Sequence, residues 1–345
     1  MNAPLPDLPD GLVREAVAPE RLVVVWTSAQ VDALLAALGD AGHLPLVLEP
    51  VETLELIDVS GPPAVLLVDP ALLDDATLDL VDRIRRDWPQ TRVVVLAGAG
   101  ADGAGLLRAM RAGLGEVVDP ADPASALDLV GQHPPGAQER VLAVGAHPDD
   151  IEIGCGATLL RHRRLGHAIT VLTLSRGAVG GETELRRREA AGASMALSAE
   201  LLMADLPDTR IGDSHDAVEL VEAAIAHARP TTVYVHSKAD NHQDHRAVHE
   251  ATVIAARRVP QLYCYQSPSS RNEFAPTKFV PVGETIEEKV ELLAHYRSQA
   301  QRHYLAPDLV VATARYWARQ LPHARYAEPF EVLRASEHES FTTSP

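Results

Sequence analysis

The residues of this 345-residue chain that could do chemistry lie in two segments rich in histidine and aspartate. In the first, His147 is followed by Pro148 and by two adjacent aspartates, Asp149 and Asp150, just after the apolar run 141–144. Neighbouring carboxylates repel each other, and a bound cation would remove that repulsion. The same aspartates could instead interact with the dipole of a helix that begins there. The first segment alone leaves both interpretations open.

The second segment, 236–249, follows another predicted strand. It contains a dense set of side chains of the types that bind metals: His236, Asp240, His242, Asp244, His245 and His249. In an open α/β sheet, ligands bind beyond the carboxyl ends of the strands. We therefore expect the two segments to form one metal site. Catalytic zinc takes three ligands from histidine and carboxylate and leaves a fourth position for water. Cys155 is a poor ligand candidate, because it lies in the predicted following helix.

Strands and helices alternate along most of the chain, which predicts an α/β protein with mostly parallel sheets. The fold class that we expect is two Rossmann-like, three-layer domains. We place the first over 20–132 and the second over 140–334. A polar linker that contains Pro and Gly, 133–139, separates them. Residues 1–19 and 335–345 are expected to be a flexible N-terminus and tail.

The expected elements follow the apolar runs. In the first domain the predicted strands are 21–27, 45–49, 64–69, 92–98 and 115–119, and the predicted helices are 28–42, 75–88, 103–113 and 123–132. In the second domain the predicted strands are 140–146, 168–175, 200–206, 231–237 and 261–266, and the predicted helices are 151–166, 183–198, 216–228, 244–258 and 285–304.

The first domain resembles the receiver domain of response regulators in layout. Asp69, followed by proline, lies at the end of the third predicted strand, where receivers place their phospho-acceptor. The partner positions depart from that pattern: Thr27 and Ser28 replace acids, Ala97 replaces a hydroxyl residue, and Asp119 replaces lysine. Without the acidic pocket and the lysine, phosphate charge on Asp69 would be poorly neutralised. We therefore predict a degenerate, receiver-like (flavodoxin-like) domain.

The second domain contains several motifs of known type. They are AHPDD at 146–150, LRRRE at 185–189, LPD at 206–208, HSKADNHQDHRAVH at 236–249, SQ at 298–299 and AEPF at 327–330. Together they resemble the PIG-L/LmbE-like family of metal-dependent N-deacetylases over about residues 139–334. The combination of AHPDD with a downstream HxDH is specific, whereas each motif alone is weak.

The resemblance implies a zinc ion bound by His147, Asp150 and His245. Other divalent ions such as Fe²⁺ or Mn²⁺ are alternatives to Zn²⁺. The third ligand has its own alternative, because His245 and His249 form an i, i+4 pair of metal-binding type.

The resemblance also implies the roles of five further residues. Asp149 would be the general base, His242 would stabilise the oxyanion, and Asp244 would orient a neighbouring histidine. Arg186 and Asp208 would bind substrate, although the first is equally explained as a solvated helix charge and the second as the start of a turn. Either Asp149 or His242 could return the proton to the leaving amine.

Zinc chemistry of this kind fits the hydrolysis of an amide, because zinc lowers the pKa of bound water to about 7 and polarises a carbonyl. We expect a zinc-dependent hydrolase that removes an acyl group, usually acetyl, from an amino-sugar-like small molecule or glycoconjugate. The sugar preference comes only from the resemblance. The alternative is a regulatory protein whose receiver-like domain mediates partner binding and whose second domain is a metal-binding remnant. A dinucleotide-dependent dehydrogenase is disfavoured, because the aspartates at 149–150 would lie where a pyrophosphate binds.

The composition limits the partners. A net charge of −17 argues against nucleic acid or an anionic membrane. The two cysteines, Cys155 and Cys264, make no disulfide framework. The sequence shows neither a signal-peptide pattern nor a run of 18 apolar residues. We therefore expect a cytoplasmic protein that acts on a small molecule and has no membrane span, with homo-oligomerisation left open.

Overall fold

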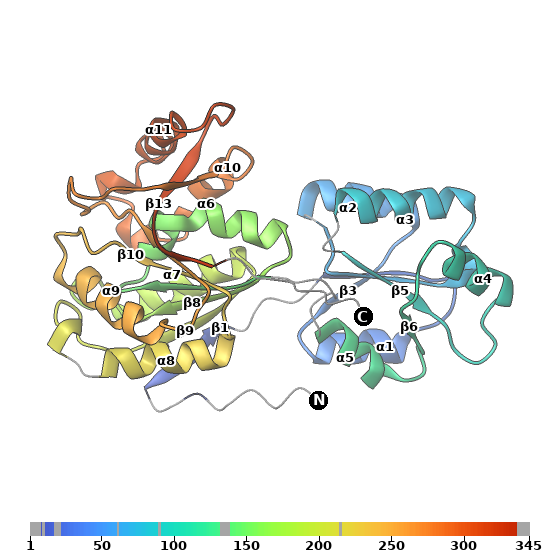
Figure 1. Ribbon diagram of the computed structural model, residues 1–345. Coiled ribbons are helices and arrows are strands. Elements are labelled where there is room, and N and C mark those ends of the chain that lie inside the picture. The colour runs from blue at the N-terminus through green and yellow to red at the C-terminus, as the bar shows by residue number, and fades with distance from the viewer. Residues whose placement is uncertain are drawn as a thin grey trace, which may run out of the picture. The chain divides into compact units, whose positions relative to one another are not determined.

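The computed structural model describes residues 8, 11–16, 22–60, 62–88, 91–131, 139–213 and 216–336, which form two α/β units (Figure 1). The described residues of the larger unit come from 1–18, 139–163 and 167–345, and those of the smaller unit from 19–138 and 164–166. Except for Glu139, the predicted linker lies outside the described residues.

The larger unit is built on a mixed sheet with the strand order β1-β9-β8-β7-β10-β11-β13-β12. Its strands are β1 (Leu12–Ala16), β7 (Arg140–Gly145), β8 (Ala168–Thr173), β9 (Ala199–Ala204), β10 (Thr232–His236), β11 (Gln261–Tyr265), β12 (Lys278–Pro281) and β13 (Ala327–Ala335). The five strands from β9 to β11 are parallel, and β1, β13 and β12 join antiparallel. From β7 the chain first builds outward through β8 and β9, and then returns to the other side of β7 with β10. This reversal is the point where open α/β sheets bind ligands.

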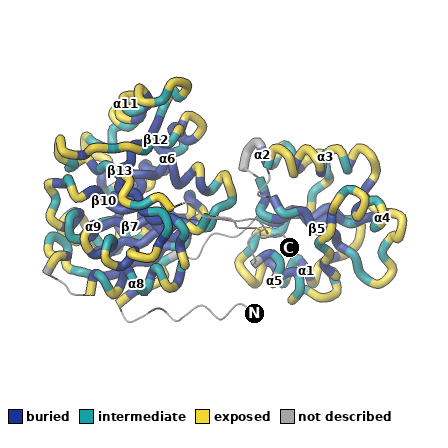
Figure 2. The backbone as a smooth tube through the Cα atoms, viewed as in Figure 1, coloured by how far each residue is buried: buried dark blue, intermediate teal, exposed yellow. Residues whose placement is uncertain are grey.

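Helices cover both faces of this sheet, as its alternating apolar residues require. The helices are α6 (Asp150–Arg164), α7 (Thr183–Ala196), α8 (Asp216–Ala228), α9 (Gln243–Ala255), α10 (Ile286–Leu293) and α11 (Pro307–Ala318). Leu142 and Val144 of β7 pack with α8 and α9, whereas Val141 and Ala143 pack with α6, α7 and α10. Figure 2 shows the resulting buried interior.

The smaller unit is a parallel sheet with the order β3-β2-β4-β5-β6. Its elements are β2 (Leu22–Trp26), α1 (Asp32–Asp40), β3 (Leu44–Val47), α2 (Pro50–Ser60), β4 (Val65–Val68), α3 (Asp75–Asp87), β5 (Arg92–Leu96), α4 (Gly103–Arg111), β6 (Val117–Val118) and α5 (Pro123–Gly131). Val23 and Val25 pack with α1 and α5, and Val24 and Trp26 pack with α2, α3 and α4. This strand order is that of doubly wound, flavodoxin-like sheets. The likeness to receivers stays a prediction.

The N-terminal segment differs from its prediction. Residues 12–16 were expected to be flexible, but they form β1, which pairs with β9. Leu12 is buried in the core, and Arg14 Nε lies 2.6 Å from Glu200 Oε1. The strand has five residues and follows a Pro-rich stretch, so its pattern of apolar and polar residues is too short to predict a strand. At the other end, Ala335 belongs to β13, and the predicted tail beyond residue 336 lies outside the described residues.

The helix predicted over 285–304 is too long, because α10 ends at Leu293. Short 3-10 turns follow at Arg297–Gln299 and His303–Leu305. Glu189 of α7 accepts hydrogen bonds from Ser298, from its backbone N at 2.7 Å and its Oγ at 2.6 Å. These hydrogen bonds to another helix take the place of the backbone hydrogen bonds that a continued α10 would make. The helices α2 and α11 and the strands β12 and β13 were not predicted.

Among the described residues, every helix is too short or too polar to cross a bilayer.

Gly154 of α6 permits a close approach of Tyr265, which supports the end of β7. The Tyr265 hydroxyl donates to Val144 O at 2.8 Å, and its ring centroid lies 4.8 Å from that of His236. A Cβ on Gly154 would overlap the Tyr265 ring. We expect Gly154→Ala to lower the free energy of unfolding by about 1–3 kcal/mol in urea titrations. Gly283→Ala is the control, because its Cβ would meet nothing within 4 Å. Equal stability of the two variants would contradict this account.

Asp69 is expected not to accept phosphate. Its Oδ2 lies 3.5 Å from Thr27 Oγ1 and 3.4 Å from Ser28 Oγ, and its Oδ1 accepts from Ala71 N at 2.9 Å. An acyl phosphate would place a charge of roughly −2 beside these neutral groups. Incubation with acetyl phosphate and Mg²⁺ should therefore leave the intact mass unchanged. A phosphate adduct that disappears in Asp69→Ala would show that the domain is phosphorylated.

Candidate metal centre and active site

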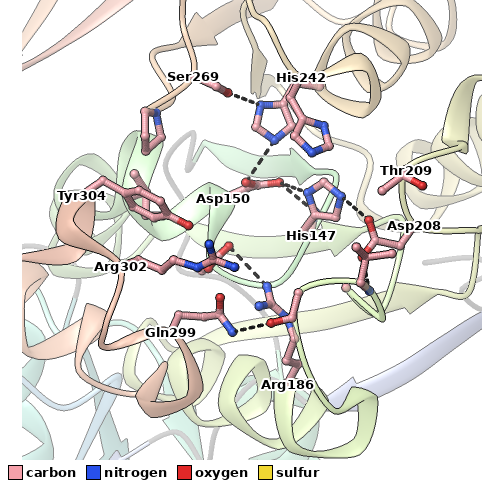
Figure 3. Close-up of a pocket in the computed structure, with 17 residues that line it drawn as sticks. His147, Asp150, Arg186, Asp208, Thr209, His242, Ser269, Gln299, Arg302 and Tyr304 are labelled. Carbon is pink, nitrogen blue, oxygen red and sulfur yellow. Dashed lines mark hydrogen bonds and ion pairs between the residues drawn. The ribbon is translucent and has the colours of Figure 1, made fainter.

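A pocket of about 300 Å³ opens at the carboxyl ends of β7 and β10 (Figure 3). It brings the two predicted segments together, since its lining includes His147, Asp149, Asp150, His242 and His245. These residues come from the turn after β7 and from the start of α9. The expectation that both segments meet at one sheet edge therefore agrees with the geometry.

The turn after β7 folds tightly around the carboxylate of Asp150. Asp150 Oδ2 accepts from the backbone N of His147 at 2.7 Å and from that of Ala146 at 3.2 Å. To make this turn, Asp149 adopts a φ of 102°, in the left-handed region that is unfavourable for residues with a side chain. Strained backbone of this kind concentrates at functional sites.

Three imidazoles surround Asp150. Its Oδ2 lies 3.2 Å from His147 Nδ1 and 3.2 Å from His236 Nε2, and its Oδ1 lies 3.3 Å from His245 Nε2. The ligand atoms of His147, Asp150 and His245 all lie within 4.8 Å of one another. This set of two nitrogens and a carboxylate, in which Asp150 and His245 are buried and His147 is partly buried, matches the ligands of a catalytic zinc site.

The charges of this cluster shift each other's pKa values. Burial alone would raise the pKa of Asp150, but His245, His236 and His147 hold it well below its usual range. Burial alone would lower the pKa of His245, but Asp150 and Asp240 raise it to about 9. In the same way Asp150, with Asp208 and Asp244, raises the pKa of His147 well above its ordinary value against the effect of burial. The site therefore favours positive charge around Asp150.

Carboxylates also hold the outer nitrogens of both candidate ligand histidines. His147 Nε2 lies 3.1 Å from Asp208 Oδ1 and 3.2 Å from Asp244 Oδ2. His245 Nδ1 lies 3.0 Å from Asp240 Oδ2. Such contacts fix the tautomer, so that the inner nitrogens can act as ligands. Asp244 makes the contact that the predicted histidine-orienting role needs, and Asp240 is a second such residue that had no assigned role.

Asp208, predicted as a substrate contact, lines the pocket and also contacts neighbouring protein groups. Besides the contact with His147, its Oδ2 accepts from Val179 N at 2.8 Å. Burial alone would raise the pKa of Asp208, but hydrogen bonds from His147 and Val179 lower it to about 2. Both carboxylate oxygens are thus engaged by the protein. The geometry favours a positioning role for Asp208.

His249, the alternative third ligand, lies apart from the other candidate ligands. Its Nδ1 donates to His236 O at 2.8 Å and lies 3.6 Å from Cys264 Sγ. The candidate metal-binding groups among the described residues include His245 and not His249. Cys155 is fully buried in the core between α6 and the sheet, as expected.

Asp149 is buried beside the candidate ligands and is held by Arg186 of α7. Arg186 Nη2 lies 3.5 Å from Asp149 Oδ1 and donates to Pro148 O at 2.5 Å. Burial and then the charge of Asp150 raise the pKa of Asp149 to about 8, although Arg186 opposes the shift. Only 3% of Arg186 is exposed, so the interpretation as a solvated helix charge is wrong. Arg186 Nε has no hydrogen-bond partner among the described residues.

Gly177 allows the loop before α7 to close around the Arg186 guanidinium. Its φ is +65°, and a Cβ there would lie 2.5 Å from Arg186 Nε. Glycine is the residue that tolerates both this backbone conformation and this close approach. The glycine-rich segment after β8 thus wraps an arginine.

His242 lies at the N-cap of α9 and faces the pocket (Figure 3). Its Nδ1 accepts from Asp244 N at 3.2 Å, so the neutral ring carries its proton on Nε2. Burial and the nearby His245 lower the pKa of His242 and thus favour the neutral form. The geometry therefore leaves an N–H donor on His242.

The pocket lining also includes residues for which no role was predicted. They are Ser269, Gln299, Arg302 and Tyr304. Ser269 Oγ donates to Asp240 Oδ1 at 2.6 Å, and Gln299 Nε2 donates to Gly180 O at 3.1 Å. Figure 3 shows Tyr304 and Arg302 pointing toward the buried carboxylates. Of these residues, Gln299 belongs to the SQ motif at 298–299, whereas Ser269, Arg302 and Tyr304 lie outside the motifs identified in the sequence.

Comparison with known proteins identifies a family that the sequence of the larger unit matches. Residues 142–256 match the family profile of PIG-L, described as GlcNAc-PI de-N-acetylase. The uncharacterized deacetylase YaiS of Escherichia coli K12 is 34% identical over 155 residues, which are 43% of this chain and 84% of that protein.

Two solved structures show the same fold. The N,N'-diacetylchitobiose deacetylase of Pyrococcus horikoshii has a TM-score of 0.51 at 17% identity, over 56% of this chain and 84% of that one. GalB, the 4-carboxy-2-hydroxymuconate hydratase of Pseudomonas putida KT2440, has a TM-score of 0.51 at 20% identity, over 58% of this chain and 99% of that one. At these identities the likeness concerns the fold alone.

The larger unit is thus an α/β domain of the class that the PIG-L profile describes. The chain belongs to the PIG-L family, to which its similarity with YaiS and the match over residues 142–256 assign it.

Proposed function

We propose that the chain is a zinc-dependent hydrolase that removes an N-acyl group, in particular N-acetyl, from an amino-sugar-like small molecule or glycoconjugate. The observation that carries the proposal is Asp149, a buried carboxylate that lines the pocket beside the three candidate ligands and belongs to none of the candidate metal-binding groups among the described residues. A purely structural metal site needs no such group. The deacetylase relative YaiS supports the same reaction class.

The donor set fits a divalent ion, with Zn²⁺ preferred and Fe²⁺ or Mn²⁺ as alternatives. His147, Asp150 and His245 would hold it, and Asp208, Asp240 and Asp244 would orient the two histidines. When bound, the ion supplies Lewis acidity, which activates water and polarises the carbonyl of an amide.

The other pocket residues would then carry the proton transfers and the developing charge. Asp149 accepts a proton from the attacking water, and Arg186 holds its carboxylate in place. The Nε2–H of His242 donates to the oxyanion of the tetrahedral intermediate, and donors of this type contribute about 2.7–4 kcal/mol. The amine leaves with a proton returned by Asp149 or His242.

The substrate class is inferred from the relatives and from the pocket wall. The Pyrococcus structure with this fold is a deacetylase of N,N'-diacetylchitobiose, an acetylated amino sugar. Arg302 and Tyr304, which line the pocket, would hydrogen-bond to hydroxyls of such a substrate.

The test is release of acetate and of free amine from a panel of N-acetylated amino sugars and their glycoconjugates by zinc-loaded protein. Turnover that is lost in Asp149→Asn supports the proposal. Zinc binding without turnover on the panel would favour the alternative, a regulatory protein with a metal-binding remnant. Hydration of an unsaturated carboxylate, the type of reaction named for GalB, would show that the shared fold serves another reaction here.

A further inference from the structure

A second group of metal-binding side chains lies at the amino ends of β7 and β8, the opposite ends from those at the pocket. Glu139 directly precedes β7, His162 is in the last turns of α6, and His167 directly precedes β8. One donor atom from each lies within 4.8 Å of the other two. The deacetylase site uses none of these residues.

The two imidazoles face each other through the same type of nitrogen. His162 Nδ1 lies 2.7 Å from His167 Nδ1, and Glu139 Oε2 lies 3.7 Å from the first and 3.9 Å from the second. Two lone pairs at this separation repel each other unless a proton or a metal ion lies between them. Burial lowers the pKa of both imidazoles, although Glu139 opposes this for His167, and so favours the neutral rings that bind metal ions.

The outer nitrogen of His162 also has a fixed partner. His162 Nε2 lies 2.9 Å from the hydroxyl of Tyr234, a buried residue of β10. When Nε2 carries the ring proton and donates it to Tyr234, the lone pair of Nδ1 points toward His167 and Glu139. A hydrogen bond to the outer nitrogen is the usual support of a ligand histidine.

Glu139 is the most exposed of the three side chains. The side chain of His162 is 10% exposed, that of His167 16% and that of Glu139 35%. Solvent therefore reaches the carboxylate more readily than the two imidazoles. An ion could enter there and keep water in a remaining coordination position.

We propose that Glu139, His162 and His167 form a second divalent-cation site, suited to Zn²⁺. Two imidazole nitrogens and one carboxylate oxygen are ligands that zinc accepts, and imidazole is poorly suited to Mg²⁺ or Ca²⁺. Only small adjustments are needed, because the donor atoms already converge. A bound ion would join the start of β7, the end of α6 and the start of β8.

The test counts zinc ions per chain by native mass spectrometry, after chelation and back-titration with Zn²⁺ alone. To remove the deacetylase site, His147→Gln and His245→Gln are combined, because each candidate group at the pocket contains one of these residues. We expect two ions in the wild type, one in this double variant and none when His167→Gln is added. His167 is chosen because it is more exposed than His162 and its change should spare the core.

His323→Gln is the control for the loss of an exposed histidine and should keep two ions. A double variant that binds no zinc would overturn the proposal and show that the pair is an ordinary hydrogen bond. His167→Gln alone should keep one ion, and its retention of both would also overturn the proposal. If the pocket binds no zinc, the wild type and the double variant should each bind one ion. Failure of the deacetylase proposal is therefore distinguishable from failure of the second site.

Discussion

Asp149→Asn is expected to keep the metal at the pocket and to lose about 10²–10⁴-fold in kcat, the usual effect of removing a general base. The amide has nearly the shape of the carboxylate but cannot accept a proton from water. Asparagine is also among the residues that tolerate positive φ best, so the turn after β7 should persist with its φ of 102° at this position. Steady-state kinetics and metal analysis of the same preparation measure both effects.

Asp205→Asn is a matched control, because this aspartate lies outside the pocket lining and its side chain is 71% exposed. It should retain wild-type kcat. Loss of the metal from Asp149→Asn would mean that the roles of Asp149 and Asp150 are exchanged. Near-normal turnover would exclude Asp149 as the base.

Removal of the metal by a chelator is expected to abolish hydrolysis, and added Zn²⁺ should restore it. Uptake should release protons, because the apo-protein's pKa of His245 is raised to about 9 and the ion must displace that proton. His147, whose pKa is also raised, must lose a proton as well, so the apparent affinity should rise by at least about tenfold per pH unit between pH 7 and 9. Isothermal titration calorimetry in buffers of different ionisation enthalpy measures the affinity and the protons released.

His245→Gln should lose this pH dependence together with the ion. Full activity of a protein shown to be free of metal would contradict the proposed mechanism. An affinity that falls with rising pH would contradict the protonation state assigned to His245.

The strand-and-helix pattern was a sufficient guide to the two ligand segments. Two apolar runs, Arg140–Gly145 before His147 and Thr232–His236, are buried parallel strands. Their carboxyl ends therefore meet at the same edge of the sheet. The sequence alone could not show that β7 and β10 are neighbours, because strand order depends on how the connecting helices pack. The first domain's strands were predicted for the same reason, whereas α2, with its weak amphipathic pattern, was not.

The pocket wall formed by Gln299, Arg302 and Tyr304 could not be derived from local pattern. These residues lie where the periodic sequence predicts that the helix continues. The chain instead forms 3-10 turns, in which Ser298 donates two hydrogen bonds to Glu189. The contact of Asp208 with His147 was equally hidden from the sequence. A carboxylate after proline is typical of a turn, and its approach to His147 depends on the packing of β8 and β9.

Far-apart segments supply the two halves of the candidate ligand set. His147 lies 97 positions before Asp244, whose Oδ2 is 3.2 Å from His147 Nε2, and the third candidate ligand, His245, directly follows Asp244. An unfolded chain cannot hold them together, so the ion binds the native state almost exclusively. By mass action, free ion at 100 times its dissociation constant adds about 2.7 kcal/mol to the free energy of unfolding. Ion availability would then govern how long this chain survives proteolysis as well as how fast it turns over substrate.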